Sequence, residues 1–234
     1  MTSQLVLTSR AAVWALATAT IVLGGLILRK AFGLGTSAGT AALPLWSLAL
    51  AAVWTLGGTA LMLLARAHAA RHRSADPAPG PPTRLTAASA GWRALAIGAV
   101  LAGASFLGGW VLSLIPATAP WITAALVTAG TSAAGLTLAA AVVTGLSEEV
   151  FFRLGLADLF RGRARWIAPT VIYTLVTCAT LNPGLIAAAP VVGLAAAWAR
   201  ESTGRWFAPL IVHGLWSIAM VGIFPLAAPV PGGI

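Results

Sequence analysis

Long, nearly uninterrupted runs of apolar residues occupy most of the chain. Most runs have about the 20 residues that a helix needs to cross a hydrocarbon core about 30 Å thick. Two shorter runs are separated by Asn182-Pro183-Gly184, which is a strong turn signal. The pattern predicts an all-α, polytopic membrane helix bundle of about seven transmembrane helices. The predicted spans are 11–28, 44–64, 94–115, 121–146, 166–181, 185–199 and 206–227.

The composition leads to the same conclusion. Hydrophobic residues make up 59% of the 234 residues and charged residues only 8%, whereas soluble domains carry about 25% charged residues. No stretch is left that could build a separate aqueous core, which excludes a soluble accessory domain. We divide the chain into residues 1–115, with three helices and a basic, proline-rich cytoplasmic loop at 65–93, and residues 121–228, a catalytic core of about four helices.

The positive charge indicates how the chain lies in the membrane. The formal net charge is +9, and the predicted N-terminus with the second, fourth and sixth loops holds every Lys and Arg except Arg29 and Lys30. By the positive-inside rule the N-terminus is cytoplasmic and the C-terminus lies outside. Basic residues in short loops indicate contact with the lipid bilayer and its phospholipid surface, and no nucleic acid partner. We expect an integral, multi-pass protein of a bacterial cytoplasmic membrane.

Two adjacent carboxylates, Glu148 and Glu149, follow the predicted span 121–146. A carboxylate in or near hydrocarbon costs a few kcal/mol on insertion scales, so such residues mark functional sites. Glu149 and Arg153 are four residues apart with the acid first, and Arg153 can therefore neutralise Glu149. Glu148 lies about 100° away around the helix, free to face a cavity and accept a proton from water. A structural ion cluster at a helix end is the alternative interpretation.

One histidine, His213, lies in the middle of the last predicted span. Its burial is costly without a partner, and Ser217 follows at i+4 on the same helix face. Imidazole and hydroxyl can together present hydrogen-bond donors to one point in the bundle. Alternatively, a lone intramembrane histidine simply bonds a neighbouring helix.

These residues carry a resemblance to a known family. The string Glu148-Glu149-Val-Phe-Phe-Arg153, followed about sixty residues later by His213-Gly-Leu-Trp-Ser217, resembles the CPBP family of intramembrane proteases. This family is also called the CAAX protease and bacteriocin-processing enzyme family, or Abi family. Its motifs are EExxxR, then FxxxH on the next helix, then HxxxN or a similar polar residue on a later one. The resemblance covers residues 121–220, approximately.

The resemblance implies an intramembrane endopeptidase similar to the type II CAAX prenyl endopeptidases. Its substrate would be a membrane-associated peptide or protein, cut near the membrane surface in a cavity open to the cytoplasmic leaflet. The family roles make Glu148 the general base, pair Glu149 with Arg153, and give His213 and Ser217 the stabilisation of the oxyanion. The cofactor is unknown: a divalent metal such as zinc is an open question, because one histidine offers too few ligands.

The middle motif departs from the family, because no histidine occurs in residues 166–182. One register places Val176 at the aromatic position and Thr180 at the histidine position; the other places Tyr173 and Thr177 there. Thr180 can hold a water by hydrogen bonding, but it cannot act as a base near neutral pH. The alternative function is therefore a weakened or inactive pseudo-protease that serves as a membrane-protein binding scaffold. A small transporter is a third hypothesis, although two related halves are absent.

Overall fold

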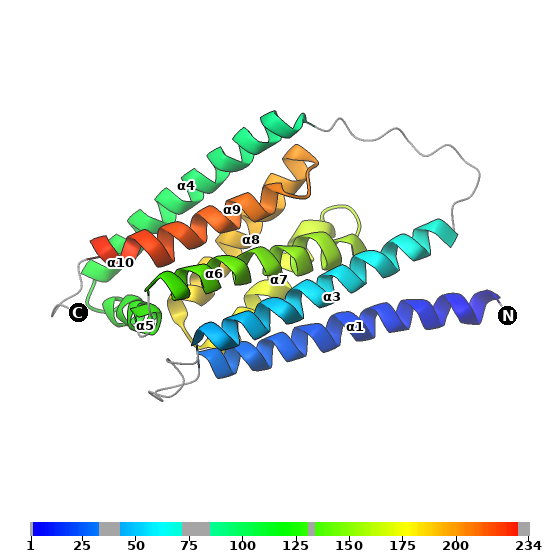
Figure 1. Ribbon diagram of the computed structural model, residues 1–234, viewed down its shortest axis with the longest axis horizontal. Coiled ribbons are helices and arrows are strands. Elements are labelled where there is room, and N and C mark those ends of the chain that lie inside the picture. Colours follow the sequence, from blue (N-terminus) through cyan, green and yellow to red (C-terminus); the bar gives the residue numbers. More distant parts are fainter. Residues whose placement is uncertain (1, 33–42, 72–84, 131–133, 229–234) are drawn as a thin grey trace.

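Helices form the whole architecture of the described chain (Figure 1). The structure is a computed structural model that describes residues 2–32, 43–71, 85–130 and 134–228, and these ranges contain no strand. The α-helices are α1 (Thr2–Ala31), α3 (Leu43–Arg71), α4 (Ala87–Leu114), α5 (Ala119–Gly130), α6 (Ala134–Glu149), α7 (Ala164–Thr177), α8 (Pro183–Thr203), α9 (Ala208–Ser217) and α10 (Phe224–Ala227). Two π-helical segments, η1 (Val150–Gly155) and η4 (Ile218–Ile223), and two 3-10 turns, η2 (Leu156–Leu159) and η3 (Cys178–Thr180), continue some of them.

The predicted polytopic helical bundle is confirmed, with a correction to its spans. In the part of the chain that the structure describes, six stretches are long and apolar enough to cross a membrane, namely 10–31, 43–67, 87–114, 135–159, 183–203 and 208–227. The predicted span 121–146 is shared between α5 and α6, because apolar length alone does not show where one helix stops. The predicted span 166–181 corresponds to α7, whose 14 residues fall short of the roughly 20 that a full crossing needs.

The predicted loop at 65–93 is shorter than the sequence suggested. Helix α3 continues to Arg71, and α4 begins at Ala87, where the Thr86 hydroxyl accepts a hydrogen bond from the Ser89 amide at 3.2 Å and caps the helix. Residues 72–84, with the proline-rich stretch, lie outside the described residues. In Figure 1, α1 begins and α3 ends toward the same end of the long axis, whereas α10 ends at the opposite end.

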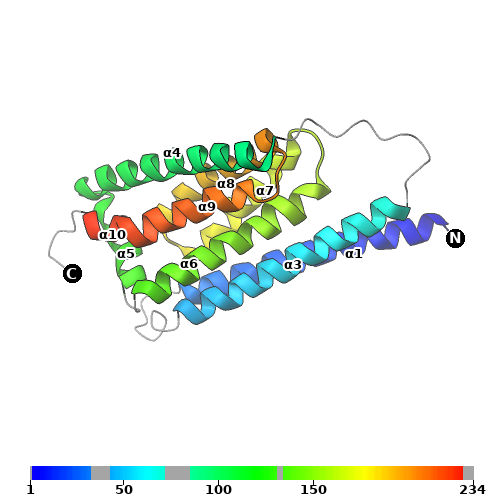
Figure 2. The same cartoon turned by 45° about the horizontal axis from the view of Figure 1, so that its top comes forward.

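The bundle is layered around α6. Both views show α1 and α3 on one side of α6 and α4, α8 and α9 on the other (Figures 1 and 2). Large apolar side chains are exposed on the outside, among them Leu56, Val100 and Leu175. Such a surface suits lipid, which solvates apolar groups as readily as a protein core does.

One buried cluster joins α1 and α3 to the segment that follows the acidic pair. Trp54 of α3 is fully buried, and its ring packs 4.9 Å from Phe151 and 5.1 Å from Phe152 of η1, measured between centroids. Gly58 lets the two backbones approach, because a Cβ there would lie 2.6 Å from the Val150 carbonyl oxygen. Small residues allow such close helix contacts in membranes, so α3 directly supports the acidic segment.

A second buried cluster holds α9 against α4 and α8. Leu101, Val192 and Val212 pack together there, one from each helix. The Trp216 indole also donates a hydrogen bond to the Ser105 hydroxyl at 3.1 Å. These contacts fix the rotation of α9 and with it the face that carries His213.

Candidate active site

The two adjacent carboxylates lie near the middle of a membrane span. Glu148 and Glu149 end α6, but the helix continues through η1 and η2 to Leu159, and the apolar stretch covers 135–159. The prediction that they sit at the end of a span is therefore wrong. Charge is disfavoured in lipid, so the sequence predicts that the span ends at the acidic pair. The chain instead pairs these charges inside the bundle. The change to a π-helical segment directly after Glu149 is of a kind that often occurs at functional sites.

The Glu149 carboxylate contacts two side chains in the core, those of His213 and Arg153. Its Oε1 lies 2.7 Å from His213 Nδ1, so the imidazole N–H donates to the carboxylate. Its Oε2 lies 3.3 Å from Arg153 Nε, which is the ion pair that the i, i+4 spacing predicts. The side chain of Glu149 is 0% exposed. Each carboxylate oxygen thus has its own partner, and Glu149 is a fixed counter-charge.

Glu148 lies on the other side of the same imidazole and is less tightly held. Its Oε2 is 3.8 Å from His213 Nε2, which is too long for a direct hydrogen bond, and a water that contacts both atoms would lie beside the line that joins them. Its side chain keeps 11% of its surface exposed. Of the two carboxylates, Glu148 is therefore the one that can exchange a proton with water.

Close packing of α6 against α9 places the histidine. Gly145 lies one turn before Glu149, and a Cβ at Gly145 would meet His213 Nε2 and Ser217 Oγ, both at 3.0 Å. His213 and Ser217 are both buried and both face this glycine. The structure thus brings together Glu148, Glu149, Arg153, His213 and Ser217, all of which the sequence singled out.

Thr180, the residue at the histidine position of one register of the middle motif, makes its hydrogen bonds within the turn after α7. It belongs to the 3-10 turn after α7, and its hydroxyl donates to the Thr177 carbonyl oxygen at 2.8 Å. The same hydroxyl accepts from the Asn182 amide at 3.2 Å, and the Asn182 side chain in turn caps α8 by accepting from Leu185 N at 3.1 Å. Thr180 therefore shapes the turn between α7 and α8.

One further aromatic side chain borders the site. Tyr173 on α7 is buried next to His213 and Arg153. Its ring packs on Phe152 with centroids 5.2 Å apart and faces His213 at 6.4 Å. Two features of the sequence point to Tyr173. It is the chain's one tyrosine, and it occupies the aromatic position of one register of the middle motif.

The Arg153 guanidinium is enclosed between α7 and α8. Its Cζ lies 5.1 Å from the centroid of the Tyr173 ring, a cation–π arrangement. A Cβ on Gly193 would be 2.7 Å from Arg153 Nη2 and 2.8 Å from Thr170 Cγ2, so only a glycine leaves room for the guanidinium. Within the described residues, neither Nη atom has a hydrogen-bond partner.

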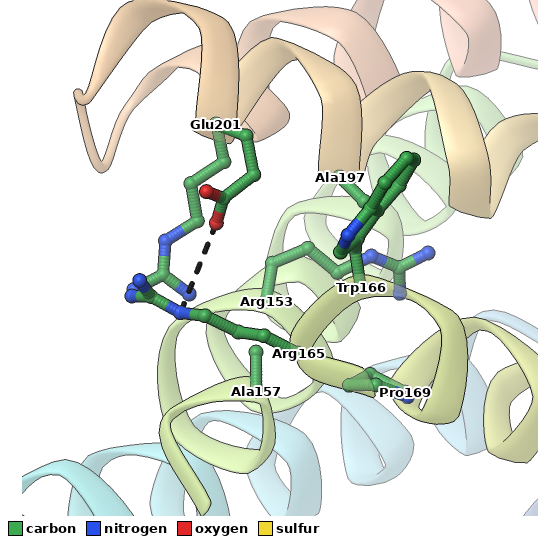
Figure 3. Close-up of a pocket in the computed structure, with 8 residues that line it drawn as sticks. Arg153, Ala157, Arg165, Trp166, Pro169, Ala197 and Glu201 are labelled. Carbon is green, nitrogen blue, oxygen red and sulfur yellow. Dashed lines mark ion pairs between the residues drawn. The ribbon is translucent and has the colours of Figure 1, made fainter. Parts of the chain in front are cut away.

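Beyond the buried cluster, a charged pocket lies toward the end of the span. Figure 3 shows Arg165 and Glu201 facing each other across it, with the Arg153 side chain directed away from this pair. Arg165 Nη2 donates to Asp158 Oδ1 at 2.8 Å, and Arg200 Nη2 donates to the same oxygen at 3.0 Å. The network ties η2, the start of α7 and the end of α8 together, outside the carboxylate and histidine cluster.

Comparisons with known proteins relate part of the chain to a family. Residues 129–219 match the family model described as Type II CAAX prenyl endopeptidase Rce1-like, and all of the clustered side chains lie in this segment. The resemblance to the CAAX protease family is thereby confirmed for this segment, which is similar to a CAAX-protease-like intramembrane peptidase. Neither the curated proteins nor the solved structures gave a match. Among the described residues, no group of three His, Cys, Asp or Glu side chains is placed to hold a metal ion.

Proposed function

We propose that this protein is an intramembrane endopeptidase in which Glu148 activates water for attack on a peptide bond. The observation that carries the proposal is the position of Glu148 beside His213, whose other nitrogen is held by Glu149. A carboxylate fixed on one side of an imidazole defines the direction of the other ring nitrogen. The water site between Glu148 and His213 Nε2 is thereby oriented from both sides.

The reaction follows the usual course of peptide hydrolysis. Glu148 takes a proton from water while the water oxygen attacks the carbonyl carbon, and the carbonyl π electrons move to its oxygen. The Ser217 hydroxyl donates to this oxyanion, and His213 does so through Nε2 when both of its ring nitrogens carry a proton. The C–N bond then breaks, and Glu148 returns the proton to the leaving amine nitrogen. Water and peptide bond are consumed, and a carboxylic acid and an amine are formed.

The position of the site supports a membrane-associated peptide or protein as substrate. Glu148 lies near the middle of the stretch 135–159, so a scissile bond must come from within the bilayer or be threaded into the bundle from its surface. The basic end of the bundle, with Arg161, Arg163 and Arg165, is placed on the cytoplasmic side by the positive-inside rule. This orientation and a bacterial cytoplasmic membrane as the location are parts of the proposal.

The test is cleavage of a membrane-tethered fluorogenic peptide library by the purified protein in bilayer discs. Glu148→Gln keeps the volume of the side chain but removes the base, so we expect a loss in kcat on the order of 10²- to 10⁴-fold. Glu201→Gln is the matched control, because this carboxylate is 45% exposed and pairs with Arg165 at the pocket. Equal cleavage by wild type and Glu148→Gln would refute the mechanism.

The second candidate is a binding scaffold that holds membrane peptides without cutting them. The observation that favours it is the absence of an imidazole in α7, combined with the use of the Thr180 hydroxyl in the turn. A scaffold predicts that Glu148→Gln retains binding of membrane peptides in a pull-down from the same discs, with no cleavage by either protein.

A further inference from the structure

An apolar groove follows the outer side of the helix pair α7 and α8. Its volume is about 330 Å³, and its walls include Ile167, Val171 and Leu175 from α7 and Pro190 and Leu194 from α8. Val171 and Leu175 are both exposed in the bundle. The groove therefore opens to the lipid that surrounds the protein.

Two threonines also line the groove, but their hydroxyls are already bonded within α7. The Thr170 hydroxyl donates to the Trp166 carbonyl oxygen at 2.7 Å, and the Thr174 hydroxyl donates to the Thr170 carbonyl oxygen at 2.9 Å. An extended peptide would leave its backbone groups unpaired in such surroundings, which costs several kcal/mol for each group. A hydrocarbon chain needs no hydrogen-bond partner and suits the groove.

The length of the groove matches one leaflet of a membrane. From Ile167 to Leu175 the helix rises about 12 Å, and half of a hydrocarbon core is about 15 Å thick. Trp166 comes directly before the groove, and Trp198 follows Leu194 by one helical turn; both indole rings are exposed. Exposed tryptophans mark the membrane interface, so the groove begins near the level of the lipid headgroups.

Positive charge lies at this headgroup end. The Arg163 carbonyl oxygen accepts a hydrogen bond from the Ile167 amide at 3.2 Å, so Arg163 lies one turn before Ile167 on the groove face of α7. Its side chain is exposed. On the α8 side, the Arg93 guanidinium lies 5.9 Å from the centroid of the Trp198 ring. The groove is thus flanked by a cation on each side.

The carboxylates at this end of the bundle are paired with other arginines. Asp158 Oδ1 accepts from Arg165 and from Arg200, and Glu201 lies 3.8 Å from Arg165 Nε. Arg163 forms no ion pair with any residue that the structure describes. Its charge therefore stays available for an anion at the end of the groove.

We propose that the groove binds one anionic phospholipid, with an acyl chain between α7 and α8 and the phosphate beside Arg163. A guanidinium binds phosphate through several N–H donors at once, and basic sites between membrane helices recognise anionic headgroups. The bound lipid bridges the two helices whose packing at Thr170 and Gly193 encloses the Arg153 guanidinium. The site is separate from the carboxylate and histidine cluster, so the inference does not depend on peptidase activity.

The test counts the lipids bound to the full chain by native mass spectrometry. Delipidated protein in detergent is titrated with phosphatidylglycerol, which is anionic, or with phosphatidylcholine, which has no net charge. We expect one phosphatidylglycerol to bind in preference, and Arg163→Gln to weaken its binding about fivefold. Arg66→Gln is the matched control, because Arg66 is an exposed arginine of α3 on the same predicted side of the membrane.

A second variant tests the acyl chain without a change of charge. Val171→Trp fills the groove from an exposed position, so the core is not disturbed, and we expect it to lose the bound phosphatidylglycerol. Val100→Trp on the exposed face of α4 is its control and should bind like wild type.

Four results would overturn the proposal. Wild-type binding by Val171→Trp would show that no acyl chain lies in the groove. Equal losses in Arg163→Gln and Arg66→Gln, or equal binding of the two lipids, would show that the groove end does not select an anionic headgroup. If a membrane-spanning helical peptide binds in place of the lipid and only Val171→Trp abolishes this, the groove is a peptide site.

Discussion

Gly145 offers the sharpest test of how α6 and α9 assemble the site. In Gly145→Ala the new methyl group would lie 2.9 Å from His213 Cδ2, whereas ordinary contacts begin at 3.4 Å. The imidazole or the helix must therefore shift by about 0.5 Å or more. The neighbouring atoms belong to a short histidine and to Ser217 on a packed helix, so the strain cannot be relieved by a flexible chain end.

In Gly145→Ala we expect the displacement of His213 to lower the cleavage rate more than it lowers the stability of the fold. Overpacking of this kind costs about 1–3 kcal/mol, but His213 Nδ1 would also move relative to Glu149, to which it is bonded at 2.7 Å. Misplacement of catalytic groups by about 1 Å can cost on the order of 10²-fold in rate. We expect Gly145→Ala to lose roughly 30- to 100-fold in kcat while it remains folded in detergent.

The assay measures cleavage of the tethered peptide in bilayer discs together with thermal unfolding of the same preparations. Gly103→Ala on α4 is the control, because a Cβ at Gly103 has no neighbour within 4 Å and alanine favours the helix by about 1 kcal/mol. Full cleavage activity in Gly145→Ala would refute the argument that this contact places His213. Loss of activity in both variants would point to a general defect in the bundle.

Three further predictions concern α7, α8 and the orientation of the chain. Gly193→Ala should unfold at a lower midpoint in detergent than Gly103→Ala, because its Cβ would be 2.7 Å from Arg153 Nη2. We expect a loss of about 1–3 kcal/mol in the free energy of unfolding. Equal midpoints would contradict the enclosure of the guanidinium. Thr180→His should not increase cleavage, because the Thr180 hydroxyl that it removes makes two hydrogen bonds in the turn. An increase in kcat would show that position 180 reaches the site. A cysteine introduced by Arg163→Cys, in a chain with Cys178→Ser, should react with a membrane-impermeant maleimide in inside-out vesicles and not in intact cells; the reverse pattern would invert the orientation.

Much of the fold can be predicted from the lengths of the apolar runs alone, and the errors in the predicted spans have a common cause. The predicted span 44–64 corresponds to 43–67, and 206–227 to 208–227, because each run is bounded by charged residues or turns. The predicted span 121–146 failed, because the sequence between α5 and α6 contains no charged residue or proline. The same predicted span ends too early, at the acidic pair, because the pairing of a buried charge with a distant helix is not visible in the local sequence.

The site was predictable where it depends on local spacing and unpredictable where it depends on packing. The Glu149 and Arg153 pair follows from positions four apart on one helix. The bond between Glu149 and His213 joins residues 64 positions apart, and the sequence analysis did not predict it. The contact between the Tyr173 and His213 rings depends on how α7 packs against α9, which no spacing of residues in the sequence specifies.

The pairing of charges explains how one carboxylate stays fixed while its neighbour remains reactive. Glu149 has a partner on each oxygen and no exposed surface, and removal of one partner from a buried ion pair costs about 3–5 kcal/mol. Its charge is therefore part of the folded structure. Glu148 has a longer contact with the same imidazole and keeps some access. Two adjacent glutamates on one helix thus have different environments, because they lie at opposite nitrogens of His213 and Glu149 is also paired with Arg153. This difference supports the proposal that Glu149 is the structural charge and Glu148 the base.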